Sequence, residues 1–434
     1  MVRRPRDHGR RRRERARARR VLAVVARGLL GAVADLRRRP RGPALAQRTR
    51  CTIEQLGPTF IKLGQVLSTR PDLLPDRLAA ELARLQDHAP VVSAPAIEAA
   101  VAAGLGAGPT TAFASFDLTP LAAASIGQVH AATLADGAAV VVKVRRPGVL
   151  DTIDLDLALL DRTARRVARV SRLARRYDVR GLADRFARTL RAECDYRLEG
   201  RNAEVIAAAV ASLPGVVVPR IDWGHTCGSV LTEARVEGVK IDDLAALERM
   251  GVDRTVVAAT FADLYLTMVF GDGFFHADPH PGNVFVAPDG TVGLVDFGMT
   301  GRVEPETRAA LGGVLLALVA TDARGLADAL LGLGMATREV DRPRLERDLG
   351  ALLADYAHRP LEELPVAEVL GRVMAVVRRH RLRLPADLAL LVKTVMMCEG
   401  VALRLDPRFL LVPRLLPFAA RLAADDSDGS ASAG

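Results

Sequence analysis

The sequence predicts an α+β protein with two lobes, and three observations support this prediction. Two short apolar runs, 128–134 and 138–144, are separated by Asp136-Gly137, which is a strong signal for a β-hairpin. A long charged helical region follows, from residue 151 to about 213. A second strand-rich segment, 283–297, lies within mostly helical sequence. This order of a small sheet, helices and a late strand insert is typical of α+β folds.

The composition is that of a folded protein in a reducing compartment. The chain has 434 residues, of which 50% are hydrophobic and 26% charged, so it can bury a sizeable core. Its four cysteines are far apart and form no Cys-x-x-Cys pair, which argues against a disulfide framework. The apolar runs 21–34 and 99–116 are interrupted by Arg27 or by glycines and a proline. We therefore expect neither a membrane span nor a signal peptide.

Changes in composition and in the pattern of apolar residues along the chain predict five segments. The order is a basic arm with an amphipathic helix, a helical extension, a small lobe with the hairpin, a helical lobe with the late strands, and a disordered tail. The corresponding ranges are 1–50, 51–113, 114–236, 237–425 and 426–434.

The basic character of the chain belongs to the arm. Eighteen of its first 50 residues are arginine against three acidic residues, a balance of +15, whereas the remaining residues sum to −5. An apolar stripe at helical steps of three and four accompanies the arginines and comprises Leu22, Val25, Leu29, Val33 and Leu36.

A basic helix with such a stripe favours an anionic membrane surface, where each charge contributes about 1 kcal/mol. Two alternatives stay open, namely docking of the stripe on the body of the protein and non-specific binding of nucleic acid. Residues 1–50 contain no aromatic residue, so base stacking is not supported.

The segment 274–298 carries the sharpest chemical signal. Asp278 and Asn283 are five residues apart on a proline-rich stretch, two short strand patterns follow, and Asp296 begins an Asp-Phe-Gly sequence. Phosphoryl transfer from a nucleotide requires an acid group near the attacking oxygen and oxygen ligands for magnesium. These three side chains supply such groups. His276 and His280 also suggest zinc, but the prolines at 279 and 281 rule out an ordinary helix there, so we expect them to position the loop.

Upstream residues suggest the phosphate-binding part of such a site. Lys143 lies in the second hairpin strand and needs an acidic partner, for which Glu193 is the candidate, with Glu199 as a second carboxylate. Before the hairpin comes a turn of small residues that would let backbone N–H groups approach phosphate. This turn comprises Ala122, Ala123, Ala124, Ser125 and Gly127.

Lysine usage gives a weaker clue. Only four of the 61 basic residues are lysines, namely Lys62, Lys143, Lys240 and Lys393. A compact ammonium and a planar guanidinium are not interchangeable at a tight site. Each lysine is therefore a candidate for a position that arginine cannot fill.

Together these motifs resemble the UbiB/AarF family of atypical kinase-like proteins, of the ubiquinone-biosynthesis type. The chain is identified as a member by motifs that run in family order over about 240 residues. They are FIKLGQVLSTRPDLLP (60–75), LQD (85–87), AAASIGQVH (122–130), Lys143, ECDYRLEG (193–200), HADPHPGN (276–283) and VDFG (295–298).

The resemblance implies a two-lobed protein-kinase-like fold in which the helical extension packs over the active site and blocks protein substrates. It implies that ATP and Mg2+ are the cofactors and that Lys62 and Gln65 lie in the pocket. It also implies that Lys143 pairs with Glu193 and contacts phosphates. Asp278 would take the catalytic-loop aspartate position. Asn283 and Asp296 would hold magnesium.

The function that we expect is an ATP-dependent atypical kinase or ATPase in isoprenoid-quinone (ubiquinone or menaquinone) or lipid metabolism. It would be cytoplasmic and peripheral to the inner face of the plasma membrane, since the sequence at 409–426 holds two arginines and two prolines. Expected partners are anionic lipids and quinone-biosynthesis proteins or quinone precursors, with no specific nucleic acid and a homodimer left open. Two alternatives are a nucleotide-switched lipid-binding scaffold and a small-molecule phosphotransferase of the choline or aminoglycoside kinase type.

Overall fold

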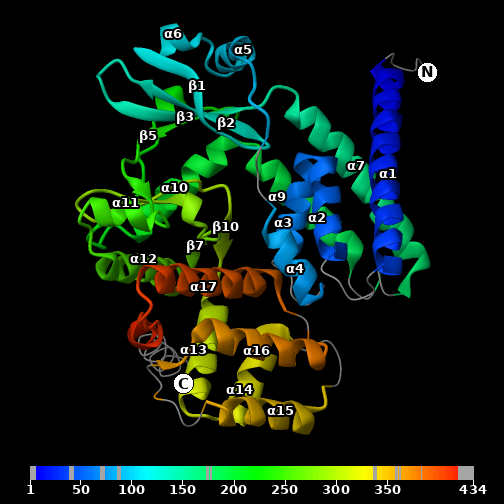
Figure 1. Ribbon diagram of the computed structural model, residues 1–434, viewed down its shortest axis with the longest axis vertical. Coiled ribbons are helices and arrows are strands. Elements are labelled where there is room, and N and C mark those ends of the chain that lie inside the picture. Colours follow the sequence, from blue (N-terminus) through cyan, green and yellow to red (C-terminus); the bar gives the residue numbers. More distant parts are fainter. Residues whose placement is uncertain are drawn as a thin grey trace, which may run out of the picture. The chain divides into compact units, whose positions relative to one another are not determined.

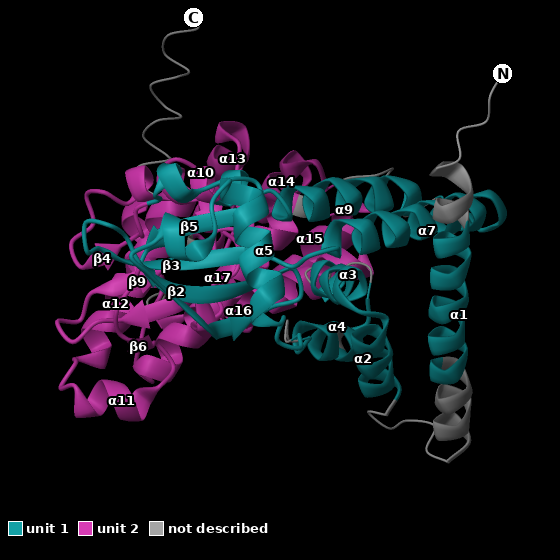
Figure 2. Cartoon of the chain, turned by 90° about the horizontal axis from the view of Figure 1, so that it is seen from above, with its two compact units in different colours: residues 1–199, 221–234 teal, residues 200–220, 235–434 magenta. Residues whose placement is uncertain are grey.

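The computed structural model describes residues 6–38, 44–68, 74–85, 89–172, 175, 178–335, 340–356, 360, 363–382 and 384–418. The chain separates into two compact units, which Figure 2 colours separately. Unit 1 comprises residues 1–199 and 221–234, and unit 2 comprises residues 200–220 and 235–434. Both units combine helices with sheet, so the expected α+β class is confirmed.

Unit 1 is built around an antiparallel sheet in the order β1-β2-β3-β5 (Figure 1). The expected hairpin is formed by β2 and β3, and in its turn Gly137 has φ +87° while the Asp136 carboxylate accepts the Ala138 N–H at 3.0 Å. Because side chains alternate across a strand, Val142 and Val144 are buried in a core with the neighbouring helix α5, whereas Lys143 projects from the opposite face. The strand bounds are Ser115–Ala123, Gly127–Thr133, Ala139–Arg145 and Val230–Ala234.

Helices make up the rest of unit 1. The helix α3 carries the Lys62-Leu63-Gly64-Gln65 sequence and packs against α2, α4, α7 and α9. Its residue Ile61 joins Leu82 and Leu85 in a small buried cluster. The helix bounds are α1 Arg6–Arg38, α2 Ala44–Leu56, α3 Pro58–Ser68, α4 Asp76–Ala83, α5 Ala94–Leu105, α6 Pro109–Ala112, α7 Val149–Val170 and α9 Val179–Glu193; α10 (Tyr196–Ala209) begins in unit 1 and ends in unit 2.

The apolar face of α1 is buried within unit 1 and includes one described member of the expected stripe but not the other. Val21 and Val24 are buried with Leu56 and Phe60, and the predicted Val25 packs against this cluster, whereas the predicted Leu22 is 67% exposed. Arg17 precedes these valines on α1 and also contacts the rest of unit 1. Its guanidinium binds the fully buried Asp156 carboxylate of α7 at 2.7 and 2.8 Å and donates to the Leu56 carbonyl at 2.7 Å. The structure thus supports docking of this face on the protein. The side chains of residues 29, 33 and 36 lie outside the described residues.

Unit 2 surrounds the buried helix α12, which packs on α17. The expected strands at 284–286 and 291–295 are confirmed as the β8–β9 hairpin, with Gly290 at φ +85° in its turn. The strand bounds are β4 Val216–Val217, β6 Val239–Lys240, β7 Phe274–His276, β8 Val284–Val286, β9 Val292–Leu294 and β10 Thr300–Arg302. The helix bounds are α11 Leu244–Arg249, α12 Arg254–Phe270, α13 Pro305–Val319, α14 Ala323–Leu330, α15 Arg342–Ala354, α16 Val366–Arg379 and α17 Ala386–Leu405.

Two further expectations concern the ends of the chain and the membrane. The predicted tail, 426–434, lies outside the described residues. Within the described part of the chain, no helix has both the length and the apolar character that a membrane crossing requires.

Candidate active site

The loop of unit 2 that follows β7 carries the predicted acid and amide. It passes through a short 3-10 turn, Pro281–Asn283, and enters β8. The Asn283 amide nitrogen donates to the backbone carbonyl and to the carboxylate of Asp278, both at 3.2 Å. Since its nitrogen faces Asp278, the Asn283 amide oxygen points away and can act as a hard oxygen ligand.

His276 joins this loop to the Asp-Phe-Gly segment. Its imidazole is fully buried; Nε2 donates to the Asp296 carbonyl at 2.8 Å, and Nδ1 accepts from the Asp278 N–H at 3.3 Å. The Tyr265 hydroxyl also lies 3.2 Å from Nδ1. Burial lowers the pKa of His276, so the ring stays neutral with its proton on Nε2. His276 therefore fixes the backbone at both predicted acids, which is a positioning role and uses both ring nitrogens.

The backbone at Asp296 adopts a strained conformation. Its φ is +65°, in the left-handed region that residues other than glycine rarely occupy. The next residue, Phe297, is fully buried with its ring edge-on to His276 at 5.7 Å, and its carbonyl accepts from the Asn202 side chain at 3.0 Å. These contacts hold the turn in place and leave the Asp296 side chain exposed to solvent.

The lysine of β3 has a close carboxylate neighbour, which is the second of the two glutamates that the sequence offered. Lys143 Nζ lies 2.6 Å from Glu199 Oε1 and 5.5 Å from the centre of the Tyr196 ring. The helix that ends at Glu193 is followed by a new helix from Tyr196, and the first turn of that helix presents the buried Glu199 to the strand. The expected pairing of Lys143 with Glu193 stays a prediction.

Glu193 contacts the other predicted lysine. Lys62 Nζ of α3 lies 3.5 Å from Glu193 Oε1 at the end of α9. Both side chains are at most 18% exposed. Two lysines and two glutamates from four separate elements of unit 1 thus form ion pairs that include Lys62–Glu193 and Lys143–Glu199.

Gln65, the other predicted pocket residue of α3, has a structural contact. Gln65 Nε2 donates to the Leu85 carbonyl at 3.1 Å, and a Cβ on Gly64 would collide with the Leu85 side chain. The glycine and glutamine together allow α3 to pack closely on the chain after α4. The expectation that Gln65 lies in the nucleotide pocket stays a prediction.

The small-residue turn is held by an arginine that sequence reasoning missed. Arg146 Nε donates to the Ala124 carbonyl at 2.6 Å, while the Ala124 N–H donates to the Gly127 carbonyl at 2.9 Å. A Cβ on Gly127 would collide with the Tyr196 hydroxyl, so glycine is required at this position. The turn is therefore tight and fixed, and Ala122, Ala123 and Ser125 lie in or beside it.

A second missed residue lies beside the predicted catalytic aspartate. Lys393 Nζ of α17 is 3.6 Å from Asp278 Oδ1. Its neighbour Thr394 is fully buried and lies 3.4 Å from the Ala277 carbonyl. The rarity of lysine in this arginine-rich chain marked Lys393 as a candidate functional residue. Its contact with Asp278 could not be predicted, because the two residues are far apart in sequence.

Known protein families and proteins match this chain over much of its length. Residues 84–330 match the ABC1 atypical kinase-like domain, and residues 349–410 match the UbiB helical domain. The chain is 40% identical to the probable protein kinase UbiB of Xanthomonas axonopodis pv. citri, over 83% of this chain and 67% of that protein. The Xylella fastidiosa (strain M23) protein of the same name is 37% identical over 83% and 66% of the two chains.

A solved structure extends the comparison to three dimensions. The complex of Rv3197 with erythromycin from Mycobacterium tuberculosis superposes with a TM-score of 0.60 at 25% sequence identity. The match covers 87% of this chain and 94% of that one. The chain spans about two thirds of the length of its UbiB relatives. The domain matches, the shared identity and the kinase-like site elements together show that this chain belongs to the UbiB family of ABC1 atypical kinase-like proteins.

Proposed function

We propose that this protein is an ATP-dependent atypical kinase or ATPase that acts at an anionic membrane surface and supports isoprenoid-quinone biosynthesis. The observation that carries the proposal is the arrangement of His276, Asp278 and Asp296, in which one buried imidazole holds the backbone of two acids. Family membership supports the same reaction class, and the name UbiB of its relatives supports the quinone connection.

The described residues fit the two cofactors of this reaction. The Asn283 amide oxygen, directed away from Asp278, and the exposed Asp296 carboxylate would hold Mg2+. When bound, Mg2+ would neutralise charge on the phosphates. The Lys143 ammonium, held by Glu199, would contact nucleotide phosphates, and the fixed small-residue turn would border them.

The role of Asp278 follows from its neighbours. The Asn283 amide and the Lys393 ammonium face its two carboxylate oxygens, which keeps the carboxylate oriented. An oriented carboxylate can accept the proton of an attacking hydroxyl or water, a role that requires an approach of about 3 Å. Asp278 is therefore proposed as the catalytic base.

Membrane contact is proposed for the outer face of α1. The apolar face of this helix is occupied within unit 1, whereas its arginines at 12, 13, 15, 19, 20 and 27 are exposed. Each would contribute at most about 1 kcal/mol near an anionic leaflet. The contact would therefore be electrostatic and would weaken with salt, without insertion of the apolar stripe.

The test measures ATP hydrolysis with and without Mg2+ and with anionic or neutral liposomes. We expect Mg2+-dependent turnover in the wild type and a loss of at least about 100-fold in Asp296→Asn and Asp278→Asn. Asp289→Asn, in the exposed turn of the same hairpin, is the matched control and should keep turnover. Wild-type protein without Mg2+-dependent binding or hydrolysis of ATP would contradict the proposal.

Membrane contact is tested by co-sedimentation with anionic liposomes at low and high salt. Arg12→Gln/Arg19→Gln should reduce binding and its salt dependence. Arg344→Gln/Arg347→Gln changes two exposed arginines of unit 2 and should not reduce binding. Equal binding of both double variants would contradict the role assigned to α1.

A further inference from the structure

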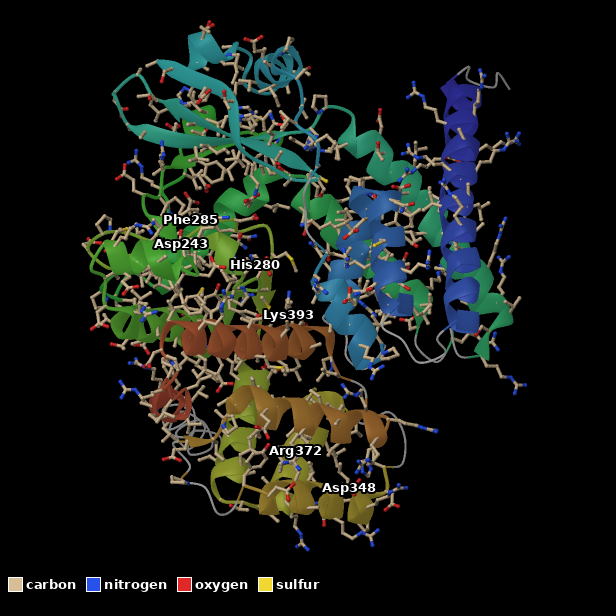
Figure 3. All side chains as sticks on the ribbon, in the orientation of Figure 1. Asp243, His280, Phe285, Asp348, Arg372 and Lys393 are labelled. Atoms are coloured by element: carbon tan, nitrogen blue, oxygen red, sulfur yellow. The ribbon has the colours of Figure 1, made fainter. Side chains whose placement is uncertain are left out.

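The helix α17 brings a cation to the predicted catalytic base. Figure 3 shows Lys393 on the edge of α17 that faces the loop of His280. Lys393 Nζ lies 3.6 Å from Asp278 Oδ1, and the adjacent Thr394 lies 3.4 Å from the Ala277 carbonyl. Two consecutive residues of the helix therefore contact two consecutive residues of the loop.

The position of this lysine is fixed by packing. One side of α17 is buried in the core of unit 2, and its buried residues include Leu388, Leu391, Cys398 and Ala402. The helix packs along α12, which is buried over much of its length after an exposed first turn. Such a helix cannot shift easily, so the Cα of Lys393 is held beside the loop while its side chain keeps some freedom.

A purely structural role explains the residue poorly. The Lys393 and Asp278 side chains are 23% and 33% exposed, and a partly exposed ion pair contributes at most about 1 kcal/mol. Arginine would serve such a pair equally well in a chain where only four of 61 basic residues are lysines. The separation of 3.6 Å is also longer than a hydrogen bond, so the ammonium is attracted to the carboxylate without being bound to it.

We propose that Lys393 is a catalytic residue that contacts the phosphoryl group being transferred. A base accepts a proton from an oxygen about 3 Å away, and that oxygen attacks phosphorus from about 3–3.5 Å. An ammonium beside the base on a flexible four-carbon stem can therefore reach the equatorial phosphoryl oxygens. This inference rests on the proposed function and assigns a new group to the same reaction.

The acceptor hydroxyl, or water, gives its proton to the Asp278 carboxylate as its oxygen bonds to the γ-phosphorus. The bond from the γ-phosphorus to the bridging oxygen breaks, and ADP leaves with that electron pair. Lys393 keeps its protons throughout and stabilises negative charge on the equatorial oxygens.

The first test uses the full chain and single-turnover hydrolysis of ATP. Lys393→Ala should lower the single-turnover rate by about 100-fold while ATP affinity changes much less. The rate of Lys393→Arg should lie between those of the wild type and Lys393→Ala. Millimolar ethylamine should partly restore Lys393→Ala in proportion to its concentration and leave the wild type unchanged. Lys240→Ala is the control, because Lys240 is the exposed lysine at the end of β6 in the same unit.

The second test does not depend on turnover. If Lys393 contacts the γ-phosphoryl group, the wild type should bind ATP more tightly than ADP. In Lys393→Ala the ratio of the ATP affinity to the ADP affinity should fall about tenfold. Lys240→Ala should keep it. An unchanged preference would overturn the inference, as would a Lys393→Ala rate within threefold of the wild type or a loss that no amine restores. Failure of the proposed function would instead appear as wild-type protein that hydrolyses no ATP.

Discussion

The acidic groups of unit 2 and the lysines of unit 1 are held in different ways. In unit 2, Asp278 and Asp296 lie on loops whose backbone is fixed by one imidazole, within a segment of 25 residues. In unit 1, Lys62 and Lys143 are held by carboxylates 131 and 56 residues away in sequence. A loop held by local hydrogen bonds depends on a few atoms, whereas long-range ion pairs depend on the packing of whole helices.

The largest loss of ATP hydrolysis is expected from substitution of His276, whose imidazole hydrogen-bonds to the backbone of Asp278 and Asp296. His276→Ala removes both hydrogen bonds between the loop and the Asp-Phe-Gly turn, so turnover should fall by about 100-fold or more. His276→Asn should lose less, because its amide can replace one bond. Steady-state hydrolysis measures this, with thermal melting to confirm folding.

The matched control is His130→Ala. His130 is a buried histidine of unit 1 and contacts Gln128 and the Asp117 carbonyl. The His130→Ala substitution should lower the free energy of unfolding and have little effect on the rate of ATP hydrolysis by the folded protein. Equal turnover losses in the two variants would show that His276 has no special role.

A buried ion pair in unit 1 should produce the next largest effect. Arg17→Ala leaves the fully buried Asp156 carboxylate without its guanidinium, which should cost about 3 kcal/mol in the free energy of unfolding. Chemical denaturation measures the loss, and Arg19→Ala on the exposed face of α1 should change stability by less than about 0.5 kcal/mol. A similar small change in both variants would mean that α1 is not docked as described.

Substitution of Glu199 and Glu193 tests which of these glutamates supports ATP binding. Glu199→Gln weakens the 2.6 Å contact with Lys143 and should raise the KM for ATP about tenfold. Glu193→Gln acts on the longer Lys62 contact and should have a smaller effect. If Glu193→Gln raised the KM more than Glu199→Gln, the partner predicted from the sequence would be the functional one.

The smallest effect concerns acid pH. Burial lowers the pKa values of His130 and His276 in the folded protein, so below about pH 6.5 the unfolded chain binds more protons than the folded one. Stability should therefore fall as the pH decreases, by at most about 1.4 kcal/mol per histidine at pH 5.5. Denaturation curves of the wild type and His276→Gln should converge as the pH falls. Parallel curves would contradict this account.

The same contrast explains what the sequence could predict. Residues 274–298 place Asp278, Asn283 and Asp296 close along the chain, and the hairpin between them follows from an Asp-Gly turn. Local spacing was sufficient to predict the hairpin and the contact between Asn283 and Asp278, whereas the roles of the three side chains stay predictions. The fold class was equally accessible, because hairpin signals and helical periodicity are local properties.

The remainder depended on packing between distant segments. The sequence does not show which turn of α10 faces β3, so it could not show that Glu199, its second candidate after Glu193, makes the 2.6 Å contact with Lys143. It could not show that Lys393 meets Asp278, since 115 residues separate them. The face of α1 was predicted only in part, because Val21 and Val24 join the predicted Val25 against the neighbouring helices, whereas the predicted Leu22 is exposed.

We propose that Asp278 and Asp296 of unit 2 act in one Mg2+-ATP reaction, since His276 holds the backbone of both. A double-mutant cycle of Asp278→Asn and Asp296→Asn, measured by Mg2+-dependent ATP hydrolysis, tests this most directly. We expect each single variant to lose about 100-fold, and the double variant to lose little more than the worse single variant. Losses that multiply fully, or a single variant with wild-type turnover, would contradict the account.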